Sequence, residues 1–157
     1  MTKIEVDQSG KIEQKQYDTR IGAAKNKMYS IVIIDKRLKR ELLSRHKQLK
    51  RKFRVLSLFT ASTFLAIRPL LSEGDTILLD DEYPNQMKLV IRLLNTLIKI
   101  HNLPKPDQII VVSHNEVKKA HLISRKPNLA NYKLMININK STTLAELYEQ
   151  TLKLLRK

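Results

Sequence analysis

The stretch that decides the fold is Thr76-Ile-Leu-Leu-Asp-Asp-Glu82, a short apolar run that ends in three consecutive acids. Its apolar residues follow one another without polar alternation, as expected of a strand that is buried on both faces. Gly74 precedes the run and Pro84 follows it, and both residue types interrupt regular structure. The pattern predicts a buried strand over residues 75–81, with the acids Asp80, Asp81 and Glu82 where it ends.

Outward from this strand, helical and strand-like segments alternate. Residues 108–113 contain a second unbroken apolar run, and the segment between the two runs has apolar residues at helical spacing. Near the N-terminus, residues 3–8 alternate between apolar and polar side chains, and Ser9-Gly10 is a turn signal that predicts a hairpin. The predicted strands are residues 3–8, 11–15, 29–34, 75–81, 108–113 and 133–139; the predicted helices are residues 36–50, 53–67, 84–101 and 115–125, and a last one that Thr143 and Glu146 cap.

This order predicts one α/β domain over all 157 residues. Antiparallel strands come first, and strands alternating with helices follow, which favours a mixed five-stranded sheet with helices on both faces. A further strand and helix follow as a C-terminal extension over residues 126–157. The last helix is expected to bury Leu144, Leu147, Tyr148, Leu152 and Leu155.

The composition is strongly basic, with 30 Lys and Arg against 15 Asp and Glu, a net charge of +15. Such an excess favours a polyanion as partner, and DNA or RNA is the partner expected here. The alternative for a basic run is a solvated helix face. The basic residues expected to bind the nucleic-acid backbone are Lys36, Arg37, Arg40, Lys50, Arg51 and Arg54.

Several functional classes are disfavoured. No apolar run approaches the roughly 20 residues of a membrane-spanning helix. We therefore expect no membrane partner, and we expect a cytoplasmic location. The chain has no cysteine, which excludes disulfides and thiolate metal sites. The four histidines lack the i, i+4 spacing typical of zinc ligands, so no zinc site is predicted from them.

Acids are scarce in this chain, so their positions carry information. Asp7 lies on the first predicted strand, and Asp80, Asp81 and Glu82 end the most apolar one, where α/β sheets gather their sites. Carboxylates held together in a basic protein suit Mg²⁺ or Mn²⁺, which need only a few acids besides water and phosphate. The alternatives are that the three acids cap the helix over residues 84–101, and that Asp7 pairs with a lysine across the hairpin.

The order of elements over residues 3–125, with Asp7 on the first strand and an acid at the end of the fourth, resembles the ribonuclease H-like superfamily. The resemblance implies that Asp7 is the central metal ligand, that Asp80 or Asp81 is the second, and that a late helix adds Glu116 or His121. Glu41 is a loose match to a glutamate that the first helix supplies in that family. The resemblance also implies a two-metal site for Mg²⁺ or Mn²⁺ and hydrolysis of phosphodiester bonds.

The sequence therefore leads to a metal-dependent nuclease that acts on DNA or RNA. Asp7, Asp80, Asp81, Glu82, Glu116 and His121 are its candidate catalytic residues, and Asp7, Asp80 and Asp81 are the metal ligands among them. The alternative is a non-catalytic nucleic-acid-binding protein, or a ribonucleoprotein component, on the same fold.

Overall fold

The computed structural model describes residues 2–125, 133–138 and 141–156, with side chains over 2–125 and 143–156. Strands and helices alternate after an antiparallel start, as the sequence predicts. The strands are β1 (Lys3–Ser9), β2 (Thr19–Lys25), β3 (Met28–Ile34), β4 (Thr76–Asp80), β5 (Gln108–Val112) and β6 (Lys133–Ile138); the helices are α1 (Lys36–Ser44), α2 (Arg51–Ile67), α3 (Met87–Ile100), the 3₁₀ turn η1 (His114–Glu116), α4 (Lys118–Arg125) and α5 (Ser141–Leu155).

The strands form one mixed sheet in the order β5-β4-β1-β2-β3-β6. The pairs β1–β2 and β2–β3 are antiparallel, while β1–β4, β4–β5 and β3–β6 are parallel. The predicted α/β class with a mixed sheet is confirmed. The C-terminal strand adds a sixth member to this sheet, because β6 pairs with β3.

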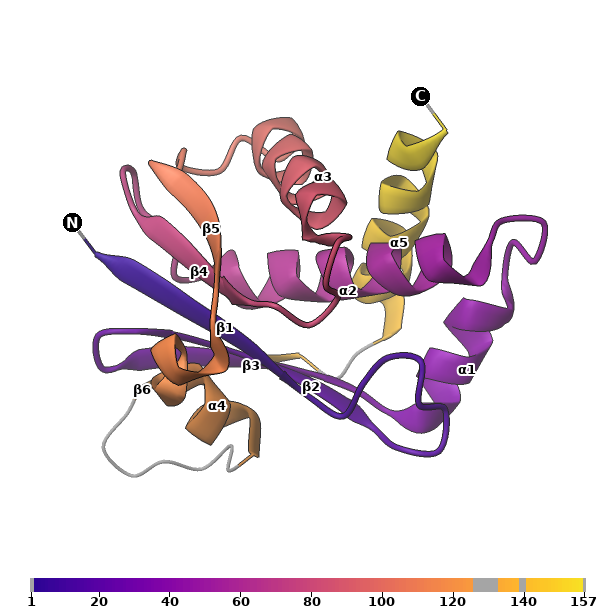
Figure 1. Cartoon of the computed structure of the whole chain (residues 1–157), viewed down its shortest axis with the longest axis horizontal. Coiled ribbons are helices and arrows are strands. Elements are labelled where there is room, and N and C mark those ends of the chain that lie inside the picture. Colours follow the sequence, from indigo (N-terminus) through magenta and orange to yellow (C-terminus); the bar gives the residue numbers. More distant parts are fainter. Residues whose placement is uncertain (1, 126–132, 139–140, 157) are drawn as a thin grey trace.

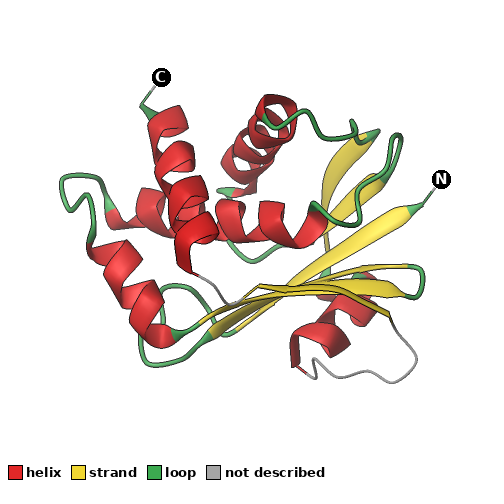
Figure 2. Ribbon diagram, turned by 180° about the vertical axis from the view of Figure 1, so that it is seen from behind, coloured by secondary structure: helices red, strands yellow, loops and turns green. Residues whose placement is uncertain are grey.

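Helices cover both faces of the sheet, as predicted. In Figure 1, α2, α3 and α5 lie above the sheet and α4 lies below it; Figure 2 shows the same layers from behind. The upper layer holds the main core, to which β1 contributes Ile4 and Val6 and α5 contributes Leu144 and Tyr148. The lower layer is smaller and packs Leu78, Val117 and Ala120 together.

The central helix of the upper layer, α2, is buried from Val55 to Ile67. Two of its buried polar side chains are hydrogen-bonded within the helix, since the hydroxyls of Thr60 and Ser62 donate to backbone carbonyls four residues earlier. A helix that is apolar nearly all round belongs in a core, and α2 lies against α3, α5 and the strands β2 and β3.

The prediction of a strand over residues 11–15 is wrong. Residues 10–18 form an irregular connection, and the second strand is β2, seven residues long. The sequence Thr-Arg-Ile-Gly-Ala-Ala-Lys of β2 shows no alternation because nearly all of it is buried. Gly10 turns the chain out of β1 with a φ of 76°, which glycine tolerates without strain.

Two helix boundaries also differ from the prediction. The helix expected over residues 36–50 ends at Ser44, and the chain passes through His46 at a φ of 57° before α2 begins. α5 begins at Ser141, so Thr143 lies inside the helix instead of capping it. Four of the five side chains expected to face inward on α5 are buried, and Leu155 is partly buried.

Over the described ranges, none of the helices combines the length and apolar character that crossing a bilayer requires.

Candidate metal centre

Strand register brings the two key aspartates side by side. The parallel pairing of β1 with β4 runs through Val6 and Leu79, so the next positions, Asp7 and Asp80, are neighbours on the same face. Val6 and Leu79 join the upper core, and the aspartates therefore point to the opposite face, toward α4. The two-residue period of a strand selects Asp80 over Asp81, and Asp81 is exposed.

Glu82 completes a group of three carboxylates. One oxygen each from Asp7, Asp80 and Glu82 lies within 4.8 Å of the others. The backbone N–H of Glu82 donates to the carbonyl oxygen of Asp80 at 2.8 Å, a tight turn that folds the glutamate back toward the strand end. The acids do not cap α3, because that helix begins at Met87 and its cap residue is Gln86.

The 3₁₀ turn η1 and helix α4 place two histidines against these acids. His121 Nδ1 lies 2.9 Å from Asp7 Oδ2, and the Ser124 hydroxyl donates to the same oxygen at 3.2 Å. His114 Nδ1 lies 3.0 Å from Asp80 Oδ2. The two imidazole rings meet edge to face with their centroids 4.3 Å apart, so both rings belong to one cluster.

Gly22 allows α4 to come this close to the sheet. It pairs with Asp7 across β1 and β2, directly beneath the helix. A Cβ at this position would lie 2.9 Å from the carbonyl oxygen of Ala120 and 3.0 Å from the backbone nitrogen of Ser124. Glu5 fixes the start of the helix, since its carboxylate accepts a bond of 3.0 Å from the Lys119 backbone N–H.

The electrostatics of the acids reflect their crowding. Burial raises the pKa of Asp7, and the neighbouring Asp80 raises it further. Burial together with the charges of Asp80 and Asp7 raises the pKa of Glu82 to about 8. Burial opposes ionisation of Asp80 as well, but hydrogen bonds, that from His114 foremost, outweigh it and lower its pKa. The bond to Asp80 in turn raises the pKa of His114.

The residues present fit a bound cation. The Asp7 side chain is fully buried, and its Oδ1 has no hydrogen-bond partner among the described residues. A buried carboxylate oxygen without a partner is costly, and three crowded carboxylates repel one another. A divalent ion would satisfy the oxygen and remove the repulsion, so these side chains form a candidate metal centre.

Two of the predicted acids lie elsewhere. Glu116 forms a capping box with Ser113 at the start of η1, its carboxylate accepting from the Ser113 backbone N–H at 3.2 Å. Glu41 pairs with Arg45 one turn away on the exposed side of α1. Neither belongs to the groups of potential ligands found in the described residues, and the prediction of Glu116 as a site residue is replaced by His114.

Sequence reasoning missed His114. A signal for it was present, because His114 comes directly after the predicted strand over residues 108–113, and the carboxyl ends of parallel strands meet at one edge of a sheet. The i, i+4 rule concerns two histidines on one regular helix. Here one histidine lies on η1 and the other on α4, so their spacing of seven residues did not predict that the two imidazoles meet.

A cleft of about 350 Å³ opens onto the acids. Its lining includes Asp80, Glu82, His114 and His121 together with residues 8–11, Gln14 and Arg125. Lys11 and Arg125 therefore bring positive charge into a cleft that also contains carboxylates. The arrangement suits a phosphate group bound beside a cation.

The basic residues expected to bind a nucleic-acid backbone divide into two sets. Arg40 Nε and Arg51 donate to the carbonyl oxygens of Lys15 and Glu13, and Arg54 donates to that of Leu43. These three arginines therefore tie together the segments around α1. The remaining members, Lys36, Arg37 and Lys50, are exposed.

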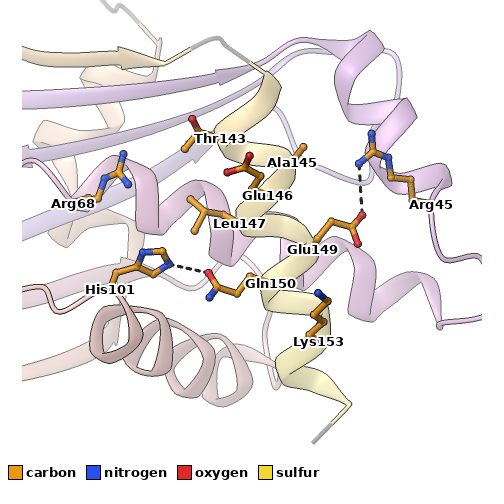
Figure 3. A pocket seen from close by; sticks show the side chains of 10 residues that line it. All are labelled: Arg45, Arg68, His101, Thr143, Ala145, Glu146, Leu147, Glu149, Gln150 and Lys153. Atoms are coloured by element: carbon orange, nitrogen blue, oxygen red, sulfur yellow. Dashed lines mark hydrogen bonds and ion pairs between the residues drawn. The ribbon is translucent and has the colours of Figure 1, made fainter.

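A larger pocket of about 680 Å³ lies elsewhere, along the outer side of α5 (Figure 3). Two pairs of its polar groups contact each other: Arg45 lies 3.6 Å from Glu149, and His101 lies 2.8 Å from Gln150. None of its lining residues is in the acid–histidine cluster.

No protein-family model, curated protein or solved structure matches this chain. The geometry of the cluster and the charge of the molecule are therefore the observations that bear on function.

Proposed function

We propose that the chain is a metal-dependent nuclease with a ribonuclease H-like arrangement of its sheet and acids. The observation that carries the proposal is the meeting of Asp7, Asp80 and Glu82 within 4.8 Å at the ends of two adjacent parallel strands. The order β5-β4-β1-β2-β3 places the first strand at the centre of the sheet beside the fourth, which supports the resemblance in the sequence.

The proposed cofactor is Mg²⁺ or Mn²⁺. Asp7, Asp80 and Glu82 would hold it, with Asp7 central because its carboxylate belongs to both groups of potential ligands. When bound, such ions activate water and stabilise the leaving oxygen during phosphodiester hydrolysis.

The protein's own side chains would bind and orient the substrate. Lys11 and Arg125 would bind phosphates of the backbone, because they line the same cleft as the acids. The Ser124 hydroxyl donates to Asp7 Oδ2 and would orient this carboxylate, whose Oδ1 has no hydrogen-bond partner among the described residues and is free for a ligand. The net charge of +15 would attract a nucleic acid to this surface.

Cleavage of labelled single-stranded DNA, duplex DNA, RNA and RNA–DNA hybrid with Mg²⁺ or Mn²⁺ tests the proposal. Asp7→Asn is expected to lower cleavage roughly 100-fold or more, since the metal supplies several kcal/mol of charge stabilisation, while nucleic-acid binding persists. Asp81→Asn is the matched control, because Asp81 is adjacent in sequence but exposed and outside the cluster.

Undiminished cleavage by Asp7→Asn would contradict the assignment of a nuclease.

A second candidate, a non-catalytic nucleic-acid binder on the same fold, has one observation in its favour: Glu41 pairs with Arg45 and supplies no carboxylate to the cluster. That candidate predicts salt-dependent binding without cleavage of any of the four substrates and without dependence on a divalent ion.

A further inference from the structure

Two different sets of ligands share Asp7. One set contains oxygen only, from Asp7, Asp80 and Glu82, whereas the other combines Asp7 with His114 and His121. The ligand atoms in each set lie within 4.8 Å of one another. The two sets therefore offer one ion an all-oxygen environment and a second ion an environment containing two imidazole nitrogens.

We propose that Asp7, His114 and His121 form a metal position selective for Mn²⁺ or a similar transition ion over Mg²⁺. This inference rests on the proposed function, and it deepens it by naming the metal and adding His114 to the ligands. Imidazole nitrogen suits transition metals, while Mg²⁺ prefers oxygen and keeps much of its water.

The spacing of the donor atoms supports this assignment. Two ligands at right angles around an ion, each about 2.1 Å from it, are roughly 3 Å apart. His121 Nδ1 lies 2.9 Å from Asp7 Oδ2, and His114 Nδ1 lies 3.9 Å from Asp7 Oδ1. Small rotations of the exposed His114 side chain, 53% accessible, are enough to bring its nitrogen nearer.

The lack of a hydrogen-bond partner for Asp7 Oδ1 among the described residues is a second observation. This oxygen belongs to a side chain that is fully buried, and no described group donates to it. His114 Nδ1 lies nearer to Asp80 Oδ2, at 3.0 Å, than to Asp7 Oδ1, at 3.9 Å, so the imidazole does not satisfy this oxygen by itself. An ion between Asp7 Oδ1 and the imidazoles would satisfy that oxygen.

The same position is open to solvent and to ligands. A hollow of about 340 Å³ lies beside the imidazoles and is lined by His114, Asn115, Lys118, His121 and Leu122. The cleft over the acids is lined by the same two histidines. An ion and its remaining water ligands therefore have space there, with Lys118 beside them to attract a phosphate.

Titration of the full-length protein with Mn²⁺ and with Mg²⁺ by calorimetry tests the preference, and pulsed electron paramagnetic resonance of bound Mn²⁺ tests the ligands. We expect Mn²⁺ to bind at least about tenfold more tightly than Mg²⁺, and its spectrum to show couplings to ¹⁴N. His114→Gln is expected to weaken Mn²⁺ binding about tenfold, with a smaller effect on Mg²⁺. His114 is exposed, so this change spares the core.

His101→Gln is the matched control, because His101 contacts Gln150 far from the acids, and it should leave both affinities unchanged. Mn²⁺ that binds without nitrogen couplings, or with equal affinity after His114→Gln, would overturn the histidine position alone and leave the carboxylate centre standing. Absence of binding of both ions would overturn this inference and the proposed metal centre together.

Discussion

At the scale of single residues, Glu82 is the acid whose ionisation should govern the stability of the metal-free protein. Burial and two neighbouring aspartates raise its pKa from an ordinary value of 4.5 to about 8. The folded state therefore holds this proton more tightly than the unfolded chain does between these pH values. In EDTA, the free energy of unfolding should fall as the pH rises through this window, by about 1.4 kcal/mol per pH unit at most.

Urea unfolding at several pH values between 4.5 and 8, with EDTA present, measures this slope. Glu82→Gln should flatten it, because the glutamine has no proton to lose, whereas Asp81→Asn should retain the wild-type slope. The raised pKa of Asp7 acts in the same direction and leaves a residual slope in Glu82→Gln. Equal slopes for wild type and Glu82→Gln would contradict the crowding of these acids.

The same acids show how far residue patterns reach. The carboxyl end of the most apolar strand pointed to Asp80, Asp81 and Glu82, and Asp7 joined them only through the resemblance to the ribonuclease H-like superfamily. The choice between Asp80 and Asp81 needed the pairing of Val6 with Leu79, a contact between strands that are distant in the sequence. Glu116 lies outside both groups of potential ligands in the described residues, and its carboxylate accepts a local capping bond from Ser113.

At the scale of secondary-structure elements, α1 holds the connection between β1 and β2 through one buried lysine. Lys39 Nζ donates to the carbonyl oxygens of Lys11 and Gln14 at 3.1 and 2.6 Å and to the Thr19 hydroxyl at 3.0 Å. The Lys39 side chain is fully buried, and this burial lowers its pKa. The irregular connection therefore obtains its polar partners from a helix instead of from a second strand.

Lys39→Met should lower the free energy of unfolding by about 2–4 kcal/mol, because it removes three hydrogen bonds donated by a buried ammonium group, two of them to carbonyl oxygens of the connection and one to the Thr19 hydroxyl. Chemical denaturation measures the difference. Arg37→Met on the same helix removes an exposed charge and should change stability by less than about 0.5 kcal/mol. Similar losses in both variants would show that the Lys39 bonds contribute nothing specific.

Elements with a clear sequence pattern, either an unbroken apolar run or apolar residues at helical spacing, were predicted correctly, whereas β2 was not. The strands β3, β4 and β5 have unbroken apolar runs, and α2 and α3 have apolar residues at helical spacing. β2 has neither pattern, because it is buried on both faces and because Gly22 and Ala24 are small on the face that α4 covers. The need for small residues on β2 comes from its tertiary contact with α4, and such a contact leaves no periodic pattern in the sequence.

At the scale of the whole molecule, the positive charge is divided between internal bonds and free surface. Arg40, Arg51 and Arg54 donate to backbone carbonyl oxygens, so replacing them would disturb folding as well as binding. Lys36, Arg37 and Lys50 are exposed and carry the part of the predicted interface that can be tested without that complication.

Replacing Lys36, Arg37 and Lys50 together by glutamine should weaken DNA binding and flatten its dependence on salt. Each lost phosphate contact removes about 0.9 from the slope of log K against log salt for duplex DNA, so the slope should fall by about 2–3. Fluorescence anisotropy across a salt series measures it. The matched control replaces three other exposed lysines by glutamine: Lys99 on α3, Lys105 on the connection from α3 to β5, and Lys153 on α5.

Both triple variants lose the same three charges, so a contribution from net charge alone would affect them equally. A larger change in the first variant would place the nucleic acid along the surface of α1 and the start of α2. That surface adjoins the connection over residues 10–18, which Lys39, Arg40 and Arg51 hold and which also provides Lys11 to the cleft. A nucleic-acid strand bound to this surface would lead toward the acids. Equal slopes of log K against log salt in the two variants would remove this surface from the proposed interface.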